Sequence, residues 1–333
     1  MSLDPQISAY AQAQAAEMAA RGIPPRHLLT PDVVRALEAA ERADDMQLAP
    51  ESVAQIVEQT IVGPASPLSL RIYTPQGDGP FPIVVYFHGG GWVLGNLDSH
   101  DAICRSITNE ATCVVIAVDY RLAPEHKFPA ALEDCFAATC WAAERASDFH
   151  GNPARLAVAG DSAGGGLAAV VAQLARERGG PVIALQMLVY PVTDLRMVSP
   201  SYAEHANAPV LTGDDMRWFR AHYIRDAHDI TNPLASPLLA ADLAGLPPAL
   251  IALAGYDPLR DEGESYGQRL QEASVPTSVL RYDDLAHGFL GHDQISTRAS
   301  SAKHETIAAL RAALWTTDRA AGVSPTAPQD TSA

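Results

Sequence analysis

The amino-acid sequence predicts an α/β protein in which a mostly parallel central sheet is flanked by helices. Short β-branched runs at residues 81–87 and 113–120 are typical of strands that are covered on both faces. Helical segments separate most of these runs, and such alternation favours right-handed crossovers within one sheet. The stretch "LAVAGDSAGGGLAA" (156–169) passes from an apolar strand through a glycine-rich corner into a helix.

The N-terminal region, about residues 1–48, is predicted to be helical. An alanine-rich helix ends at Gly22, and the next helix begins with Thr30 as its N-cap and Pro31 in its first turn. Both helices carry too few large apolar side chains to form a core. We therefore expect them to cover another part of the protein.

The strands of the sheet follow from residue 67 onward. The first of them alternates apolar and polar side chains, and the later ones are almost continuously apolar. The predicted strands are 68–75, 81–87, 113–120, 155–160, 185–191, 248–255 and 277–282.

One segment, about residues 196–232, interrupts the alternation and is predicted to be a helical insertion. Thr212 and Asp215 have the spacing of a capping box, which places Met216, Phe219 and Tyr223 on one helical face. The end of the chain is small and polar, as in a disordered tail. The sequence thus predicts a single domain over residues 1–318, with a tail at 319–333.

The composition limits the partners and the location of the protein. Its 333 residues suffice for one large core, and 39 acidic against 23 basic residues give a net charge of −16, which disfavours nucleic acid and anionic membranes. The sequence lacks the ~18–20 apolar residues of a membrane span and the features of a signal peptide, so a cytoplasmic location is expected. Without CxxC spacing, no metal site is predicted for the four cysteines, Cys104, Cys113, Cys135 and Cys140.

Ser162 stands at the corner between Gly160 and Gly164. A sharp strand-to-helix turn exposes the serine oxygen, and the residues two before and two after it must be very small. The following helix N-terminus favours a developing negative charge at the same place. The pattern predicts a nucleophilic serine.

Later strand ends supply the acid and the base that a serine nucleophile requires. Asp257 follows the strand at 248–255, and His287 follows the next strand, so the chain order is Ser, Asp, His. Of the other acidic residues nearby, Asp261 and Glu262 are expected to cap or decorate a helix, and Asp283 and Asp284 lie too close to His287 in sequence to reach it from a separate strand end. The later histidines are expected to pack or to face solvent. These competitors are Asp261, Glu262, Asp283, Asp284, His292 and His304.

Consecutive glycines after the strand at 81–87 predict a loop that binds an oxyanion. Without side chains, their N–H groups can approach a substrate oxygen. We expect Gly89 and Gly90 to donate, together with the N–H of Ala163.

A second interpretation of the corner is a dinucleotide site. Gly164, Gly166 and Ala169 fit G-x-G-x-x-A, but this pattern should occupy the turn itself, whereas here it begins inside the helix. No cofactor is therefore predicted.

Four sequence blocks resemble the hormone-sensitive-lipase-like (bacterial family IV) esterases of the α/β-hydrolase fold. They are "HGGGW" at 88, "DYRLAPEHKFPAALED" at 119, "GDSAGG" at 160 and "DPLRDEG" at 257, followed by "HGF" at 287. The resemblance implies a helical cap formed by about 1–48 and 196–232, and hydrolysis of short to medium acyl esters without metal or cofactor. It also implies a possible homodimer for the branch with an aspartate before the serine. Gly166 departs from the asparagine common in this family, which is expected to loosen the helix.

The resemblance and the motifs together favour a serine carboxylesterase. A small-molecule deacetylase or amidase with the same triad, a peptidase, and a non-catalytic ligand-binding module remain alternatives. Four aromatic side chains either line the substrate pocket or hold the cap to the body: Trp92, Trp218, Phe219 and Tyr223.

Overall fold

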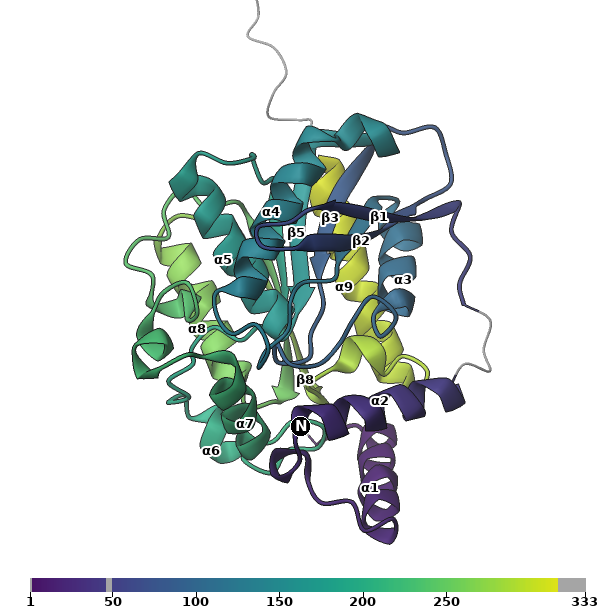
Figure 1. Ribbon diagram of the computed structural model, residues 1–333, viewed down its shortest axis with the longest axis vertical. Helices are drawn as coiled ribbons and strands as arrows, with labels where there is room; N and C mark the ends of the chain where they lie inside the picture. The colour runs from purple at the N-terminus through teal and green to yellow at the C-terminus, as the bar shows by residue number, and fades with distance from the viewer. Residues whose placement is uncertain (1, 46–49, 317–333) are drawn as a thin grey trace, which may run out of the picture.

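The computed structural model describes residues 2–45 and 50–316, and its centre is an eight-stranded sheet (Figure 1). The strand order is β1-β2-β4-β3-β5-β6-β7-β8. Strands β3 to β8 run parallel, whereas β2 pairs antiparallel with both β1 and β4. The strands are β1 (Gln55–Val62), β2 (Pro67–Thr74), β3 (Phe81–Phe87), β4 (Val114–Val118), β5 (Gly151–Asp161), β6 (Leu185–Val189), β7 (Ala249–Tyr256) and β8 (Thr277–Ala286).

The predicted α/β class and mostly parallel sheet are confirmed. Strand β1 is the element that the sequence analysis did not predict. Of its side chains only Ile61 is buried, so the strand carries almost none of the apolar alternation by which strands are recognised.

Helices cover both faces of the sheet, as Figure 1 shows. Buried residues of α3 (Asp101–Ala111) and α9 (Thr297–Thr316) belong to the core on one face. The opposite core includes residues of α4 (Ala130–Glu144), α5 (Ala163–Arg178) and α8 (Arg260–Glu272). The parallel strands are therefore buried on both sides, which explains their continuous apolar runs.

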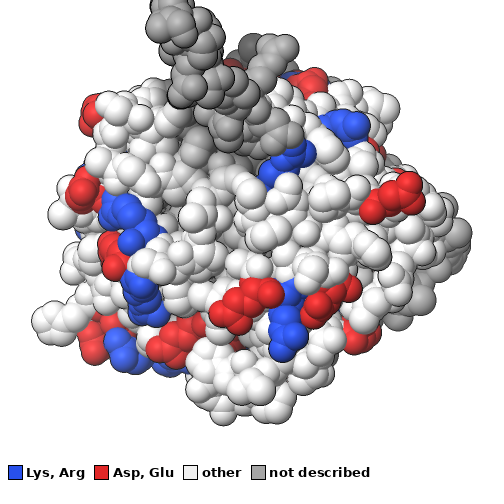
Figure 2. Space-filling model, turned by 90° about the horizontal axis from the view of Figure 1, so that it is seen from above, with Lys and Arg blue, Asp and Glu red and all other residues white. Residues whose placement is uncertain are grey.

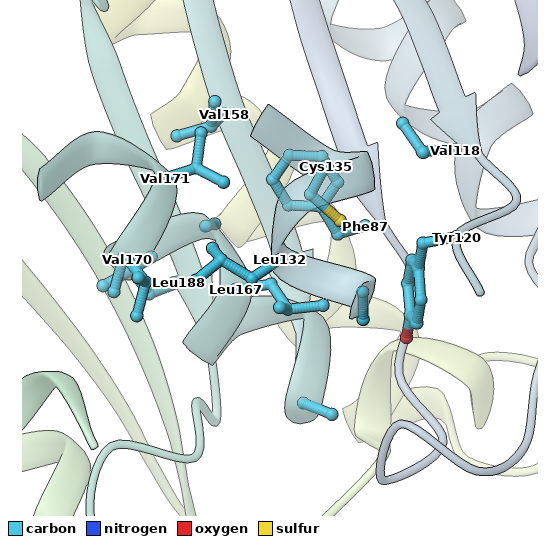
Figure 3. Packing of buried hydrophobic residues seen from close by; sticks show 14 of the residues in the cluster. Phe87, Val118, Tyr120, Leu132, Cys135, Val158, Leu167, Val170, Val171 and Leu188 are labelled. Carbon is cyan, nitrogen blue, oxygen red and sulfur yellow. The ribbon is translucent and has the colours of Figure 1, made fainter. Parts of the chain in front are cut away.

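Helix α5 packs closely on the central strands. In Figure 3, Leu167, Val170 and Val171 point from this helix into the cluster that contains Val158 and Leu188. The helix lies directly behind the corner predicted to carry the nucleophile. Its packing therefore fixes the position of that corner.

Four further helices gather at one end of the sheet, at the lower end of Figure 1. They are α1 (Pro5–Ala20), α2 (Pro31–Asp45), α6 (Ser201–Glu204) and α7 (Gly213–Tyr223), and we call them the end helices. The predicted capping box of α7 is present, and Met216, Phe219 and Tyr223, which are predicted to share one helical face, are all buried. The predicted tail at 319–333, and residues 46–48 of the N-terminal region, lie outside the described residues.

Arg35 connects the end helices to the body of the protein. From α2, its guanidinium donates to the carbonyl oxygens of Val93 and Ala123, at 2.9 and 2.8 Å. It also makes a bidentate ion pair with Glu125, with N–O distances of 2.6 and 2.9 Å. The hydrogen bond with Arg35 lowers the pKa of the Glu125 carboxyl from 4.5 to about 2. Arg35 therefore fastens α2 to the loop that follows β3 through Val93 and to the loop that follows β4 through Ala123 and Glu125.

Glu125→Gln is expected to lower Tm by roughly 1–2 °C at pH 6, since the ion pair is solvent-exposed. A carboxyl whose pKa is lowered on folding stabilises the folded state above its unfolded pKa, and that contribution disappears as the pH falls toward the folded value. The Tm difference between wild type and variant should thus shrink between pH 5 and pH 3. A constant difference, measured by thermal unfolding at each pH, would contradict the assignment.

The surface view in Figure 2 shows basic and acidic side chains side by side in small groups rather than one continuous basic area. Within the described residues, every helix is too short or too polar to serve as a membrane span.

Candidate active site

The corner between β5 and α5 has the geometry that the sequence predicts. Ser162 has φ 55° and ψ −118°, a strained conformation for a residue with a side chain. A Cβ atom on Gly164 would overlap the carbonyl oxygen of Phe87, and one on Gly160 would lie 2.5 Å from the Gly164 backbone. Only glycine fits at these two positions, and the strain holds the Ser162 side chain at the strand end.

Ser162, His287 and Asp257 form a continuous hydrogen-bonded chain. His287 Nε2 lies 3.0 Å from Ser162 Oγ, and His287 Nδ1 lies 2.7 Å from Asp257 Oδ2. Because the carboxylate can only accept, Nδ1 carries the proton and Nε2 faces the serine as an acceptor. The arrangement can remove a proton from the serine oxygen and deliver it to another atom at the same place.

Asp257 is held rigidly in its loop. Its side chain is fully buried, and its second oxygen accepts from the N–H of Leu259 at 2.8 Å. It follows β7, and His287 follows β8, so the two residues come from the ends of neighbouring strands.

The competing acids and histidines have other partners. Glu262 accepts from the N–H groups of Thr193 and Asp194, and burial raises the pKa of this carboxyl well above its ordinary value. The other four bind elsewhere: Asp261 to Ser201, Asp283 to Arg281, Asp284 to Arg298, and His304 to the carbonyl of Ser300. His292 lies next to Gly288 and packs against Tyr10.

The glycine loop after β3, residues 88–95, differs from the expectation in one donor. The N–H of Gly89 donates to Asp161 Oδ1 at 3.0 Å and is therefore not available to a substrate. In the described part of the chain, the N–H groups of Gly90, Gly91 and Ala163 make no hydrogen bond. The candidate oxyanion donors are therefore Gly90, Gly91 and Ala163. Gly91 replaces Gly89 in this set because the Asp161 side chain already accepts the hydrogen bond of the Gly89 N–H.

His88 shapes this loop without being a proton donor or acceptor for catalysis. Its Nδ1 lies 2.7 Å from the carbonyl of Gly89, and its ring stacks on Tyr120 at 4.2 Å. Burial lowers the pKa of His88 to about 3, so the ring is neutral.

The structure leaves no space for a dinucleotide at Gly164 and Gly166. Gly164 and Gly166 are buried in the first turn of α5, where Cβ atoms would overlap the carbonyl oxygens of Phe87 and Val192. Helix α5 continues unbroken past Gly166, whose N–H donates to Ser162 O at 3.1 Å, so the expected loosening of the helix is absent.

The four aromatic residues assigned to the pocket are all buried and pack between the end helices and the body. Trp92 stacks on Tyr223 at 4.0 Å, and Trp218 donates to the carbonyl of Leu29 at 2.9 Å. Phe219 also contacts the glycine loop, because a Cβ on Gly91 would overlap its ring. These contacts favour the alternative in which the aromatics hold the two parts together.

A cavity of about 590 Å³ lies among the end helices. Its walls come from α1, the segment 23–29, α2, and the residues before and at the start of α7; they are mostly apolar but include Arg26, Glu38, Asp214 and Asp215. Val210, at the edge of the cavity, lies beside Gly288, the residue after His287. The lining includes Ala15, Met18, Ala19, Ile23, Leu29, Val34, Leu37, Val210 and Thr212.

Comparisons with known proteins find similar esterases over most of the chain. The chain is 48% identical over 271 residues to carboxylic ester hydrolase LipN of Mycobacterium tuberculosis, covering 80% of this chain and 72% of the relative. It is 47% identical over 265 residues to esterase LipI of the same organism, covering 78% and 82%. The solved structure of an ester hydrolase from the metagenome of Lake Arreo, complexed with a bipyridine phosphonate derivative, is similar with a TM-score of 0.88 at 40% identity, covering 94% of this chain and 100% of that one.

A family model described as "alpha/beta hydrolase fold" matches residues 84–291, from β3 to just past His287. This match includes more than half of the chain and all three members of the hydrogen-bonded chain. The protein therefore belongs to the α/β-hydrolase-fold family, in its hormone-sensitive-lipase-like branch.

Proposed function

We propose that the protein is a serine carboxylesterase that hydrolyses short- to medium-chain acyl esters through an acyl-enzyme intermediate. The observation that carries this proposal is the chain Asp257–His287–Ser162, with links of 2.7 and 3.0 Å, at three strand ends. The names of the relatives support esters as the substrate class. The complete triad argues against a ligand-binding module without catalysis.

The first half of the reaction acylates Ser162. Its oxygen attacks the ester carbonyl while His287 Nε2 takes the hydroxyl proton, and Asp257 stabilises the imidazolium that forms. When the tetrahedral intermediate collapses, the same imidazolium gives its proton to the departing alcohol. In the second half, His287 takes a proton from a water molecule that attacks the acyl carbon. When this second tetrahedral intermediate collapses, the bond to Ser162 Oγ breaks, the imidazolium returns the proton to Oγ, and the acid leaves.

The oxyanion is held by the N–H groups of Gly90, Gly91 and Ala163. Gly90 and Gly91 have positive φ values of 107° and 60°, and the Gly90 carbonyl accepts from Val93 and Leu94, which closes the loop into a turn. Ala163 is the first residue of α5, so the positive end of the helix dipole strengthens the attraction between its N–H and an oxyanion. Such donors are preorganised and contribute mainly when charge develops.

The end helices act as the cap over this site, and the cavity among them receives the acyl or alcohol group of the substrate. Its volume and apolar lining suit a chain of short to medium length.

Met18→Trp is expected to shift the preference toward shorter chains. The larger ring fills part of the cavity from α1, so kcat/KM for the p-nitrophenyl octanoate ester should fall about tenfold relative to that for the acetate. A p-nitrophenyl ester series measured on wild type and variant gives this ratio.

Leu28→Trp provides the matched control for this experiment. Leu28 is 67% exposed, lies in the same region of the chain and does not line the cavity. The same shift in both variants, or no shift in Met18→Trp, would contradict the placement of the substrate in the cavity.

Hydrolysis of the p-nitrophenyl series by the purified wild type tests the proposed function itself. Turnover that is greatest for short or medium chains is expected. Saturable ester binding without turnover would favour a binding module.

A further inference from the structure

We propose that Asp161, paired with His100, is a positioning residue that sets the oxyanion-binding loop without touching the substrate. This inference rests on the proposed esterase function. It concerns the residue directly before the nucleophile, to which the mechanism above assigns no role.

One carboxylate oxygen of Asp161 is the meeting point of three groups. Asp161 Oδ1 accepts from the Tyr86 hydroxyl at 2.8 Å and from the Gly89 N–H at 3.0 Å, and His100 Nε2 lies 3.3 Å away. The side chain is 9% exposed. Because the Asp161 backbone leads directly into Ser162, this contact ties the nucleophile corner to the glycine loop.

Gly89 lies so close to this carboxylate that a side chain at position 89 would displace it. A Cβ atom on Gly89 would overlap Asp161 Oδ2. The peptide plane of Gly89 is therefore fixed by its hydrogen bond on one side and by the carboxylate on the other. The orientation of the following N–H groups, those of Gly90 and Gly91, depends on that plane.

Asp161 carries a negative charge close to the place where the oxyanion forms. Burial would raise its pKa, but the charge and hydrogen bond of His100, together with the Tyr86 hydroxyl, hold the pKa below its ordinary value. The ionised carboxylate is thus a strong acceptor for the Tyr86 hydroxyl and for the Gly89 N–H.

His100 takes part in the same contact through the Gly89 N–H. This N–H is shared, since it donates to Asp161 Oδ1 at 3.0 Å and to His100 Nε2 at 3.2 Å. The other ring nitrogen of His100, Nδ1, lies 2.8 Å from Ser99 Oγ, which orients the ring. The imidazole and the carboxylate therefore hold the Gly89 peptide together.

Two other titratable groups face this contact. The His88 ring, 5.4 Å from the His100 ring, is neutral because burial lowers its pKa to about 3. Burial raises the pKa of Tyr86 well above its ordinary value, so its hydroxyl stays protonated and donates to Asp161. Asp161 and His100 thus support the glycine loop through the one N–H that they share.

Asp161→Leu and Asp161→Asn test the inference as a matched pair. Leucine has a similar size but cannot accept from Gly89, whereas the asparagine oxygen can. For Asp161→Leu, kcat for p-nitrophenyl esters should fall about 100-fold, with KM within twofold, because the lost alignment matters only in the transition state. Asp161→Asn should recover kcat to within about fivefold of the wild type.

An alkyl trifluoromethyl ketone gives a second measurement. Its hemiketal with Ser162 places an oxyanion on the same donors, so its Ki should rise in Asp161→Leu in parallel with the loss of kcat. Tyr86→Phe is the control, since it removes a bond to the same oxygen but leaves the contact with Gly89. It should change kcat less than fivefold.

An unchanged kcat in Asp161→Leu would overturn the inference, and so would an Asp161→Asn variant as impaired as Asp161→Leu. If Asp161→Leu does not fold, His100→Leu takes its place, with an expected tenfold loss of kcat at constant KM. Wild-type kcat in His100→Leu would then overturn the inference. Failure of the wild type to hydrolyse any ester would instead reject the proposed function.

Discussion

Replacing Ser162 with alanine is expected to abolish ester hydrolysis, with kcat lower by about 10⁶-fold. The variant retains the donors of the oxyanion hole and the cavity, but no covalent acyl-enzyme can form. Steady-state hydrolysis of p-nitrophenyl esters measures the loss. Binding of the substrate should remain, because the cavity among the end helices does not involve the serine oxygen.

Ser301→Ala is the appropriate control for this variant. Ser301 is exposed on α9, and its hydroxyl donates to the Thr297 carbonyl of the same helix. This control should hydrolyse esters at the wild-type rate. If Ser162→Ala kept activity within tenfold of the wild type, the corner serine would have to be structural.

Asp257→Asn is expected to lower kcat by about 10⁴-fold. The carboxylate now accepts the Nδ1 proton of His287 at 2.7 Å. An amide can instead donate to this nitrogen, which leaves the proton on Nε2, so that His287 cannot accept the proton of Ser162. Steady-state kinetics together with a thermal unfolding curve separate this loss from misfolding.

Asp261→Asn is the matched control, since this carboxylate lies four residues after Asp257, in the first turn of α8, but binds the N–H of Ser201 and the Arg260 side chain. It should reduce kcat by less than about threefold. The reverse order of effects would move the orienting role from Asp257 to Asp261.

Much of the fold follows from the sequence because the parallel strands are buried on both faces. The runs that became β3, β4, β5, β6 and β7 are almost entirely apolar, and each has a clear end. β1 has only one buried side chain and pairs at the edge of the sheet, so its position depends on backbone hydrogen bonds to β2 that no sequence pattern reveals.

The positions of Ser162, Asp257 and His287 could be predicted because each follows a strand end, and parallel strands end at one edge of the sheet. Which of the three successive glycines offer their N–H groups to a substrate could not be predicted in this way. The answer depends on Asp161, at the end of β5, whose carboxylate accepts the N–H of Gly89, 72 residues earlier in the chain. The aromatic residues of α7 illustrate the same limit, since one helical face suits both a pocket wall and a packing surface.

Covalent labelling with a p-nitrophenyl alkylphosphonate tests the central claim most directly. The phosphonate phosphorus is attacked as the ester carbonyl would be, but the adduct does not turn over. The account predicts one phosphonyl group per chain, located on Ser162 by peptide mass spectrometry, with activity lost in proportion to labelling. Inhibition with the label on another residue, or full ester hydrolysis by a chain labelled at Ser162, would contradict it.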